Sequence, residues 1–213
     1  MSLLICEIFK SIQGESTFVG LPCVFVRLSG CNLNCTYCDT GYAKSEGYEL
    51  DLSRIADTVK TLGVRLVEIT GGEPLIQEET PLLAEMLSRE GYLVLVETNG
   101  SLDISVLPEG VVRIMDIKCP SSGESHSNRW ENLDFIRPGD EIKFVVCDRL
   151  DYEWAARVIM KELVKFSNTI LISPVYGQLA PQELAQWILE DNLDVRLQVQ
   201  VHKYIWSPHA RGV

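Results

Sequence analysis

Residues Pro22–Asp39 read PCVFVRLSGCNLNCTYCD and hold the two features that decide the fold. The apolar run Pro22–Leu28, rich in Val and Phe, predicts a buried β-strand that a Ser-Gly pair ends. Three cysteines, Cys31, Cys35 and Cys38, follow within a single short loop. A buried strand that leads directly into a cysteine-rich loop indicates a metal centre placed at a strand end.

Strands and helices alternate along the rest of the chain. Further strands are expected at 65–70, 92–96, 111–117, 142–146, 169–172 and 195–201, and helices at 52–62, 81–90, 152–165 and 181–189. Thr80 is expected to cap the second helix, with Pro81 at its first position. Such alternation implies parallel strands joined by right-handed crossovers. A complete eight-unit barrel takes about 250 residues, so the 213 residues predict one α/β domain, residues 1–213, folded as an incomplete, abridged TIM-like barrel with fewer than eight β-α units.

Composition limits the classes of protein and partner. The chain is 46% hydrophobic and 23% charged, which is enough to bury a core. Its net charge of −11 argues against binding to nucleic acid or to anionic membranes, because both attract basic surfaces. No apolar run reaches the roughly 18 residues of a membrane span, and the first residues lack the pattern of a secretory signal. We therefore expect a cytoplasmic protein that acts on a small molecule.

The number of clustered thiols separates the kinds of metal site. The seven cysteines are an odd number without an export signal, so a disulfide framework is not expected. Structural zinc needs four ligands, and neither a second cysteine pair nor a nearby histidine completes the set. A [4Fe-4S] cube held by three cysteines would keep one iron open. The alternatives are buried structural cysteines or a redox Cys-x2-Cys of the thioredoxin kind.

Two motifs together resemble the radical S-adenosylmethionine (SAM) superfamily. One is Cys31-x3-Cys35-x2-Cys38 with Tyr37 before the last cysteine, and the other is Gly71–Pro74 (GGEP) after the next strand. The resemblance implies a barrel of the radical SAM type and a [4Fe-4S] cluster on the three cysteines. It also implies that the open iron binds the methionine part of SAM, so that an electron from the cluster releases a 5′-deoxyadenosyl radical.

The chain is more specifically similar to the family of 7-carboxy-7-deazaguanine synthases. The motifs that carry this similarity are Ser11–Ser16, Gly20–Leu28, Cys38–Thr40, Glu97–Gly100, Asp116–Ser121 and His202–Trp206. The resemblance implies a lyase that contracts the ring of 6-carboxy-5,6,7,8-tetrahydropterin to 7-carboxy-7-deazaguanine with loss of ammonia, in queuosine and other 7-deazapurine biosynthesis. It implies SAM, a [4Fe-4S] cluster and Mg2+ as cofactors.

The same resemblance assigns roles to individual positions. The cluster ligands are Cys31, Cys35 and Cys38, and the Mg2+ ligand is Thr40, although chemistry alone favours the Asp39 carboxylate. The SAM contacts are Tyr37, Asp39, Gly72, Glu73, Asn99, Lys118, Ser121 and Ser173. The substrate contacts are Ile12, Gln13, Gly14, Glu15, Arg27, Thr70, His202 and Val213.

Several of these positions have a plain structural alternative. Arg27 lies in an apolar strand, where its charge must meet either a substrate anion or a structural carboxylate. Gln13–Glu15 could be a simple turn, and His202, placed with the last strand, could be a core histidine. The tail that ends at Val213 could be a frayed terminus.

Partners and rival functions follow from the size of the chain and from the resemblance. An abridged barrel would leave a radical exposed to water, so we expect a homodimer that helps to cover the site, with a flavodoxin or ferredoxin as reductant. The rivals are an enzyme that generates a glycyl radical on a reductase, which has no use for the Gln13–Glu15 loop or Arg27, and a non-catalytic iron-sulfur carrier or zinc scaffold.

Overall fold

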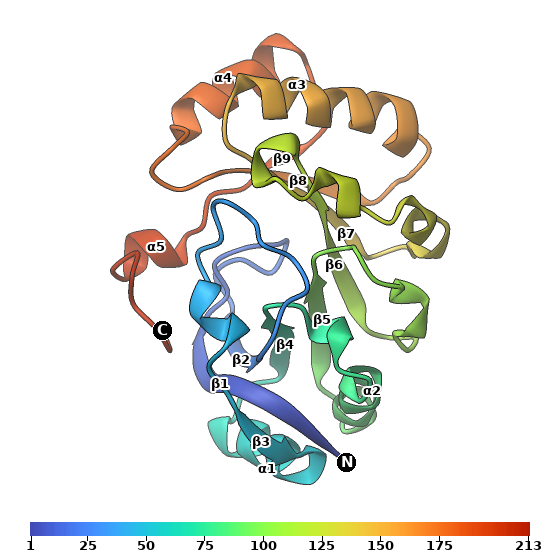
Figure 1. Ribbon diagram of the computed structural model, residues 1–213, viewed down its shortest axis with the longest axis vertical. Helices are drawn as coiled ribbons and strands as arrows, with labels where there is room; N and C mark the ends of the chain where they lie inside the picture. Colours follow the sequence, from blue (N-terminus) through green and yellow to red (C-terminus); the bar gives the residue numbers. More distant parts are fainter.

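A nine-stranded sheet forms the body of the protein in the computed structural model, which describes residues 1–213 (Figure 1). The strands are β1 (Ser2–Ile12), β2 (Pro22–Leu28), β3 (Tyr48–Asp51), β4 (Leu66–Gly71), β5 (Leu93–Thr98), β6 (Val112–Lys118), β7 (Glu141–Val146), β8 (Thr169–Pro174) and β9 (Arg196–Leu197). The helices are α1 (Leu52–Leu62), α2 (Thr80–Arg89), α3 (Arg149–Val158), α4 (Pro181–Glu190) and α5 (His202–Ile205). Short 3-10 turns are η1 (Gly41–Lys44), η2 (Pro74–Ile76), η3 (Ile104–Val106), η4 (Pro120–Ser122), η5 (Ser125–Ser127) and η6 (Trp130–Phe135), and η7 (Ile159–Leu163) is a π turn.

The strand order shows an open, largely parallel sheet. It runs β3-β1-β2-β4-β5-β6-β7-β8-β9, and every neighbouring pair from β2 to β9 is parallel. Strand β1 is antiparallel to both β2 and β3. The two ends of the order, β3 and β9, do not pair, so the barrel is incomplete as predicted.

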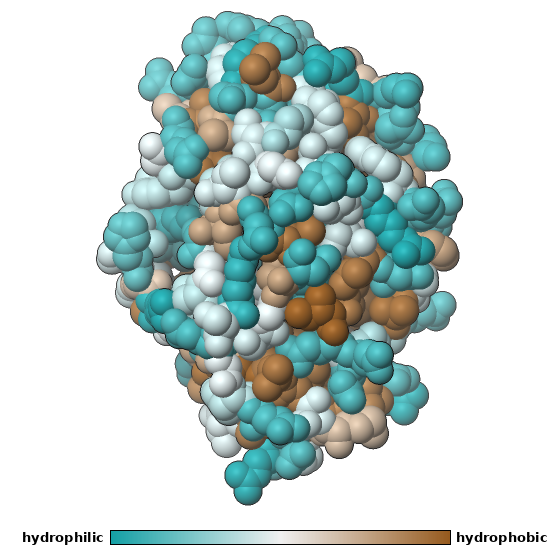
Figure 2. Space-filling model, in the orientation of Figure 1, coloured by the Kyte–Doolittle hydropathy of each residue, from teal (hydrophilic) through white to brown (hydrophobic).

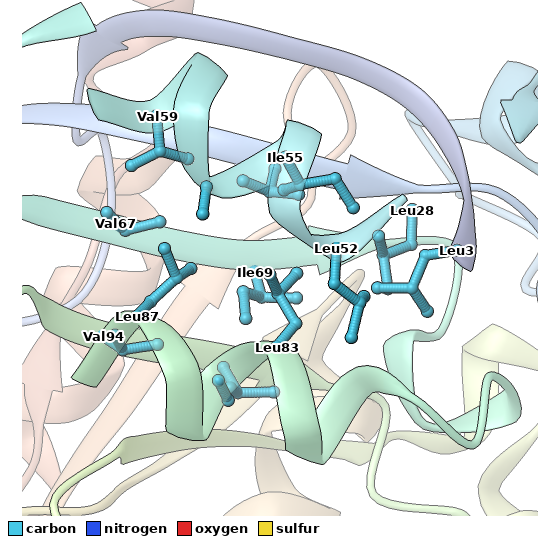
Figure 3. Packing of buried hydrophobic residues seen from close by; sticks show 14 of the residues in the cluster. Leu3, Leu28, Leu52, Ile55, Val59, Val67, Ile69, Leu83, Leu87 and Val94 are labelled. Atoms are coloured by element: carbon cyan, nitrogen blue, oxygen red, sulfur yellow. The ribbon is translucent and has the colours of Figure 1, made fainter. Parts of the chain in front are cut away.

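One face of the sheet packs against helices and holds the larger part of the core. Val67 and Ile69 of β4 lie beside Ile55 of α1 and Leu83 and Leu87 of α2, all fully buried (Figure 3). Helix α1 forms as expected because Leu52, Ile55, Ala56 and Val59 lie on one face, and Gly63 ends it in the left-handed conformation with φ of 68°. A second cluster joins β6, β7 and β8 to α3 and α4, which lie together in Figure 1.

The opposite face of the sheet has an apolar floor and a charged layer above it. The floor consists of Cys23, Phe25, Leu66, Leu95 and Ile114. Because side chains on a strand alternate between faces, the residue two positions further along each strand points the same way. Those residues are the polar set Arg27, Glu68, Glu97 and Asp116, and Lys143 of β7 pairs in register with Asp116. The sheet thus carries ionisable groups on the side away from the helices.

The two ends of the chain differ most from the expectation. Strands β1 and β3 extend the sheet beyond the predicted elements. The predicted last strand keeps only Arg196–Leu197, and His202 begins α5 and does not belong to a strand. The reason is that the backbone N–H of Val201 donates to the carbonyl of Gly14 at 3.0 Å, which draws the chain away from the sheet edge.

Helix boundaries differ by a few residues. Helix α3 begins earlier than predicted because the Asp148 side chain accepts from the N–H of Asp151 at 2.9 Å. Its predicted end is replaced by the π turn η7. Thr80 is the first residue of α2 and not its cap, since its hydroxyl donates to the carbonyl of Pro74 at 2.6 Å.

The surface mixes polar and apolar residues. On the face shown in Figure 2, hydrophilic residues predominate and hydrophobic residues lie in small groups between them. No helix of the structure has the length and apolar character needed to cross a membrane.

Candidate active site

A cavity of about 690 Å³ opens on the charged side of the sheet, and residues from β1 to the C-terminal tail line it. Carboxyl ends of parallel strands are where barrels of this kind place their ligands. The predicted site residues that line it are Ile12, Gln13, Gly14, Glu15, Arg27, Cys31, Cys35, Tyr37, Cys38, Asp39, Thr40, Thr70, Gly72, Asn99, Lys118, Ser173, His202 and Val213. Glu73 and Ser121 lie outside the lining.

The three clustered cysteines are free thiols that face this cavity. The Cys31 sulfur lies 3.5 Å from the backbone nitrogen of Leu33 and 3.9 Å from Asn99 Nδ2, both of which can donate to a thiolate. No three Cys, His, Asp or Glu side chains converge on a point where a single metal ion could sit. An iron-sulfur cube does not require such convergence, because it places each thiolate on a different iron. The donor set of this loop, three free thiols with N–H donors beside the Cys31 sulfur, therefore fits a [4Fe-4S] cluster.

Gly72 is required by close packing of the two motifs. A Cβ atom at this position would lie 2.1 Å from the carbonyl oxygen of Gly30 and 2.7 Å from Cys31 Cβ. Only a residue without a side chain lets the GGEP backbone pack this closely against the start of the cysteine loop. The two motifs that are separated in sequence thus form one wall of the cavity.

The Glu73 carboxylate is fully buried and already satisfied by protein donors. Its Oε1 accepts from Leu75 N at 3.0 Å and from the Thr98 hydroxyl at 2.8 Å, and its Oε2 accepts from Asn99 N at 2.6 Å. Burial raises the pKa of Glu73, while the bonds from Asn99 and Leu75 oppose that rise. The carboxylate fixes the end of β5 through Thr98 and Asn99, and Glu73 itself is not among the residues that line the cavity.

Ser121 lies behind the cysteine loop. Its backbone N–H donates to Asp151 Oδ1 at 2.9 Å, and its carbonyl accepts from the Thr36 hydroxyl at 2.6 Å. These bonds connect the loop after β6 to the cysteine loop. The position supports the cluster loop and does not face the cavity.

The Gln13–Glu15 loop and α5 meet at the opposite side of the cavity. Glu15 accepts hydrogen bonds from Gln200 Nε2 at 2.9 Å, from Gln198 Nε2 at 3.1 Å and from Lys143 Nζ at 3.0 Å. Burial alone would raise the pKa of Glu15, but Lys143, His202 and Gln200 together hold it below its ordinary value. The loop is therefore more than a simple turn, because it carries a part-buried carboxylate that accepts from three side-chain donors.

His202 lies against this loop. Burial lowers the pKa of His202, and Glu15 opposes that effect. A neutral imidazole offers one hydrogen-bond donor and one acceptor. His202 can therefore serve either kind of group on a heterocyclic ligand.

Arg27 has both a structural partner and free donors. Its Nε donates to Glu7 Oε1 at 2.8 Å, and the Tyr42 hydroxyl donates to the same oxygen at 2.8 Å. The side chain is 15% exposed, and its two terminal nitrogens make no hydrogen bond to the protein. The ion pair with Glu7 thus occupies Nε alone. The two terminal guanidinium nitrogens remain free to bind a carboxylate together.

The two residues after Cys38 carry oxygen atoms that could bind a metal ion. The Thr40 hydroxyl lines the cavity 3.9 Å from the Cys38 sulfur. Asp39 is already paired, since its Oδ2 lies 2.5 Å from Lys203 Nζ and accepts from Gln200 Nε2 at 3.2 Å. Burial would raise the pKa of Asp39, but Lys203 holds it below its ordinary value. Of the two competing oxygen ligands, the threonine is therefore the one without a charged partner.

The C-terminal tail folds back along the cavity. The Arg211 guanidinium lies 3.7 Å from the centre of the Tyr42 ring and pairs with Glu46 at 2.9 Å. Val213 lines the cavity beyond this contact.

Sequence reasoning missed a group of charged residues inside the barrel, namely Glu68, Glu97, Asp116, Lys143 and, on α5, Lys203. The signal was present in the sequence. Glu68 and Glu97 are each a lone charged position within an apolar run, the same pattern that singled out Arg27, and Asp116 and Lys143 lie between apolar residues of their strands. A charge at such a position is costly unless it is paired, so several strands with this pattern predict a shared polar interior.

Comparison with known proteins gives consistent results. Residues 25–118 match the model of the radical SAM superfamily. The chain is 46% identical to a 7-carboxy-7-deazaguanine synthase of Koribacter versatilis, over 98% of this chain and 99% of that one, and 45% identical to one of Chlorobaculum tepidum, over 99% and 97%. The crystal structure of QueE from Escherichia coli superposes with a TM-score of 0.78 at 22% identity, covering 94% of each chain, which supports the fold.

Proposed function

Because the chain belongs to the 7-carboxy-7-deazaguanine synthase family of the radical SAM superfamily, we propose that it converts 6-carboxy-5,6,7,8-tetrahydropterin to 7-carboxy-7-deazaguanine with loss of ammonia. The observation that carries this proposal is one cavity lined by the cluster cysteines, by Arg27 with its two free terminal nitrogens, and by the part-buried Glu15. A carboxylated pterin needs an anion-binding fork and hydrogen-bonding groups for its ring. The cavity offers both beside a cysteine loop that fits a cluster.

The three cysteines are the ligands of a [4Fe-4S] cluster in this proposal, and SAM binds beside them. When bound, these groups supply one-electron cleavage of SAM and so the radical that takes a hydrogen from the pterin. Gly72 gives the SAM methionine group access to the backbone, and Asn99 presents its amide on the same wall. The remaining SAM contacts are Tyr37, Asp39, Lys118 and Ser173. Glu73 and Ser121 act behind this wall by fixing the Asn99 and Cys31–Cys38 backbones.

The substrate lies between Arg27 and the loop Gln13–Glu15. The terminal nitrogens of Arg27 bind its carboxylate, because both are free and point to the cavity. Glu15 accepts from N–H groups of the pterin, and His202 supplies a neutral donor and acceptor. Ile12, Thr70 and Val213 complete the enclosure. This placement holds the ring fixed while water is excluded.

A Mg2+ ion bound to Thr40 and to the substrate carboxylate fits the donor chemistry of this corner. Mg2+ takes oxygen ligands and keeps several waters, so it needs few ligands from the protein. Thr40 is uncharged and faces the cavity, whereas Asp39 is neutralised by Lys203. A homodimer that helps to cover the cavity, and a flavodoxin or ferredoxin that supplies the electron, complete the proposal.

The test is a turnover assay with the reconstituted protein. Anaerobic incubation with dithionite, SAM, Mg2+ and the carboxylated tetrahydropterin should give the deazapurine and ammonia, detected by mass spectrometry and by an ammonia assay. Omission of SAM or of the pterin is the control. SAM cleavage without any deazapurine would overturn the assignment of substrate while keeping the radical SAM chemistry.

A further inference from the structure

We propose that Lys143 is a positioning residue that holds Glu15 as an ionised acceptor at the substrate side of the cavity and links it to the SAM side through Asp116. The inference deepens the proposed function, on which its catalytic part rests. It assigns a role to a residue that touches neither the cluster loop nor the tail.

Lys143 lies at the centre of the charged layer. Its Nζ is 3.0 Å from Glu15 Oε2 and 3.7 Å from Asp116 Oδ1, and it donates a hydrogen bond to Glu97 Oε1. These three carboxylates come from the loop after β1, from β6 and from β5. An ammonium has three N–H groups, so this one cation can face all three anions.

Each carboxylate leads from Lys143 to a different part of the site. Glu15 reaches Gln198 and Gln200 on the segment before α5. Glu97 accepts from the Thr70 hydroxyl at 3.1 Å. Asp116 accepts from Lys118 Nζ at 2.6 Å. Lys143 is therefore the junction between residues proposed for the substrate and a residue proposed for SAM.

Burial makes this junction sensitive to the loss of its cation. The Lys143 side chain is 6% exposed, and removal of one partner from a buried ion pair leaves charge without compensation. Burial would lower the pKa of Lys143, but Asp116, Glu15 and Glu97 raise it well above its ordinary value. Without the ammonium, the part-buried Glu15 carboxylate would bind a proton more readily and would no longer be a pure acceptor.

Charged and hydrogen-bonding side chains from several elements surround the Glu15 carboxylate. Lys143 of β7 and His202 of α5 are its charged and titratable partners, and Gln198 and Gln200 donate amide hydrogens. On β4, Glu68 stands beside it, and burial together with Glu97 and Glu15 raises the pKa of Glu68 well above its ordinary value. Lys143 is the buried ammonium whose contact with Glu15 opposes the repulsion between these two carboxyl groups.

Another buried charge in the fold shows a different arrangement. Arg113, fully buried, donates to the carbonyls of Phe135 and Leu107 and lies 3.7 Å from Asp140. None of these residues lines the cavity, so Arg113 holds neighbouring loops and Asp140 in place away from the site. Lys143 differs because all its partners are side chains that line the cavity.

The first measurement is direct and does not need turnover. The anaerobic holoenzyme, with its cluster oxidised and its glutamates labelled with 13C at the carboxyl carbon, is titrated by NMR, and the Glu15 signal is assigned by its loss in Glu15→Gln. In Lys143→Met the pKa of Glu15 should rise by about one to three pH units, the usual effect of losing an adjacent opposite charge. Lys143→Arg should keep it low. Lys118→Met, which removes the other cation on Asp116, is the matched control and should leave Glu15 unchanged.

The second measurement connects this ionisation to the reaction. In Lys143→Met the acid limb of the kcat/KM profile should move to higher pH, which a merely structural defect would not cause. If Lys143→Met does not fold, Lys143→Met combined with Glu97→Gln removes one anion with the cation and gives the same readouts. A Glu15 titration or an acid limb that stays where it is in the wild type would overturn the inference. A wild type that makes no deazapurine would overturn the proposed function instead, and the NMR titration would still decide the role of Lys143.

Discussion

Gly14 and His202 pack so closely that a Cβ atom on Gly14 would lie 2.1 Å from His202 Nδ1 and 2.9 Å from the His202 backbone nitrogen. The contact joins the loop after β1 to the helix that begins the C-terminal segment. Because backbone hydrogen bonding reinforces it at Gly14 and Val201, the two ends of the chain close the substrate side of the cavity together. The close approach also explains why this loop needs a glycine.

Gly14→Ala should therefore damage the substrate side of the site. The methyl group collides with backbone as well as with the imidazole, so α5 must shift and His202 with it. A displacement of about 1 Å can cost about 100-fold in rate, and we expect a fall of that order in kcat/KM for the pterin. Gly41→Ala is the matched control, since nothing lies within 4 Å of its added methyl. Equal kcat/KM for the two variants would contradict the role of this contact.

Arg27→Lys should raise KM for the carboxylated pterin by about 10- to 100-fold, the range expected for loss of hydrogen bonds to a charged group. The lysine keeps the charge but lacks the two free terminal nitrogens that form a fork. A pterin without the carboxylate tests the assignment, because its binding should be equally weak in the wild type and in the variant. If the substitution weakened both pterins alike, Arg27 would serve only its contact with Glu7.

Cys35→Ala should abolish the brown iron-sulfur absorption after reconstitution while leaving the far-UV circular dichroism unchanged. The three cavity thiols are needed together, whereas Cys147 bonds to Gln178 outside the cluster loop. Cys147→Ala is therefore the control and should retain the chromophore and the iron content. Retention of a full cluster in Cys35→Ala would exclude this cysteine as a ligand.

Glu68→Gln should change the pH dependence of stability. Burial, with Glu97 and Glu15 nearby, raises the folded-state pKa of Glu68 well above its unfolded value of about 4.3. The folded state then holds a proton that the unfolded state releases, so this group's contribution is present at low pH and is lost as the pH rises towards the folded pKa. The glutamine variant avoids that loss, and its stability relative to the wild type should be greater at pH 8 than at pH 5 in urea unfolding. Glu90→Gln at the exposed end of α2 should show no such trend.

The parallel part of the fold was predictable because its physical signals are local. Apolar strands, amphipathic helices such as Leu52–Leu62 and the glycine at position 63 each report on neighbouring residues. The edges of the sheet were not predictable from sequence. Strand β3 exists only through its pairing with β1, and the last strand is shortened because the distant Gly14 carbonyl accepts from Val201 N. An edge depends on partners that no local pattern reveals.

The same distinction applies to the site. Residues within motifs, such as Cys31 and Arg27, were found because their type is unusual at their position. The Lys143 junction was missed because its meaning depends on three carboxylates from separate strands and a loop. Glu73 was found as a motif residue, but its bond to the backbone of Asn99 could not be read from the motif.

Glu73→Gln distinguishes a direct contact with SAM from a positioning role. The carboxylate accepts three hydrogen bonds, and a glutamine can replace them only in part because its NH2 group would face one of the donors. A buried donor without a partner costs about 1–3 kcal/mol, so we expect the free energy of unfolding to fall by that amount.

Binding of SAM to this variant should weaken only through the shift of Asn99. Asn99→Ala should then weaken SAM binding, and adding Glu73→Gln to it should cause little further loss of affinity, although it should still lower the free energy of unfolding. Calorimetric titration with SAM and urea unfolding measure the two effects separately. The contrary result would be that Glu73→Gln weakens SAM binding without lowering the free energy of unfolding, and that its loss of affinity adds to that of Asn99→Ala. Glu73 would then contact SAM itself.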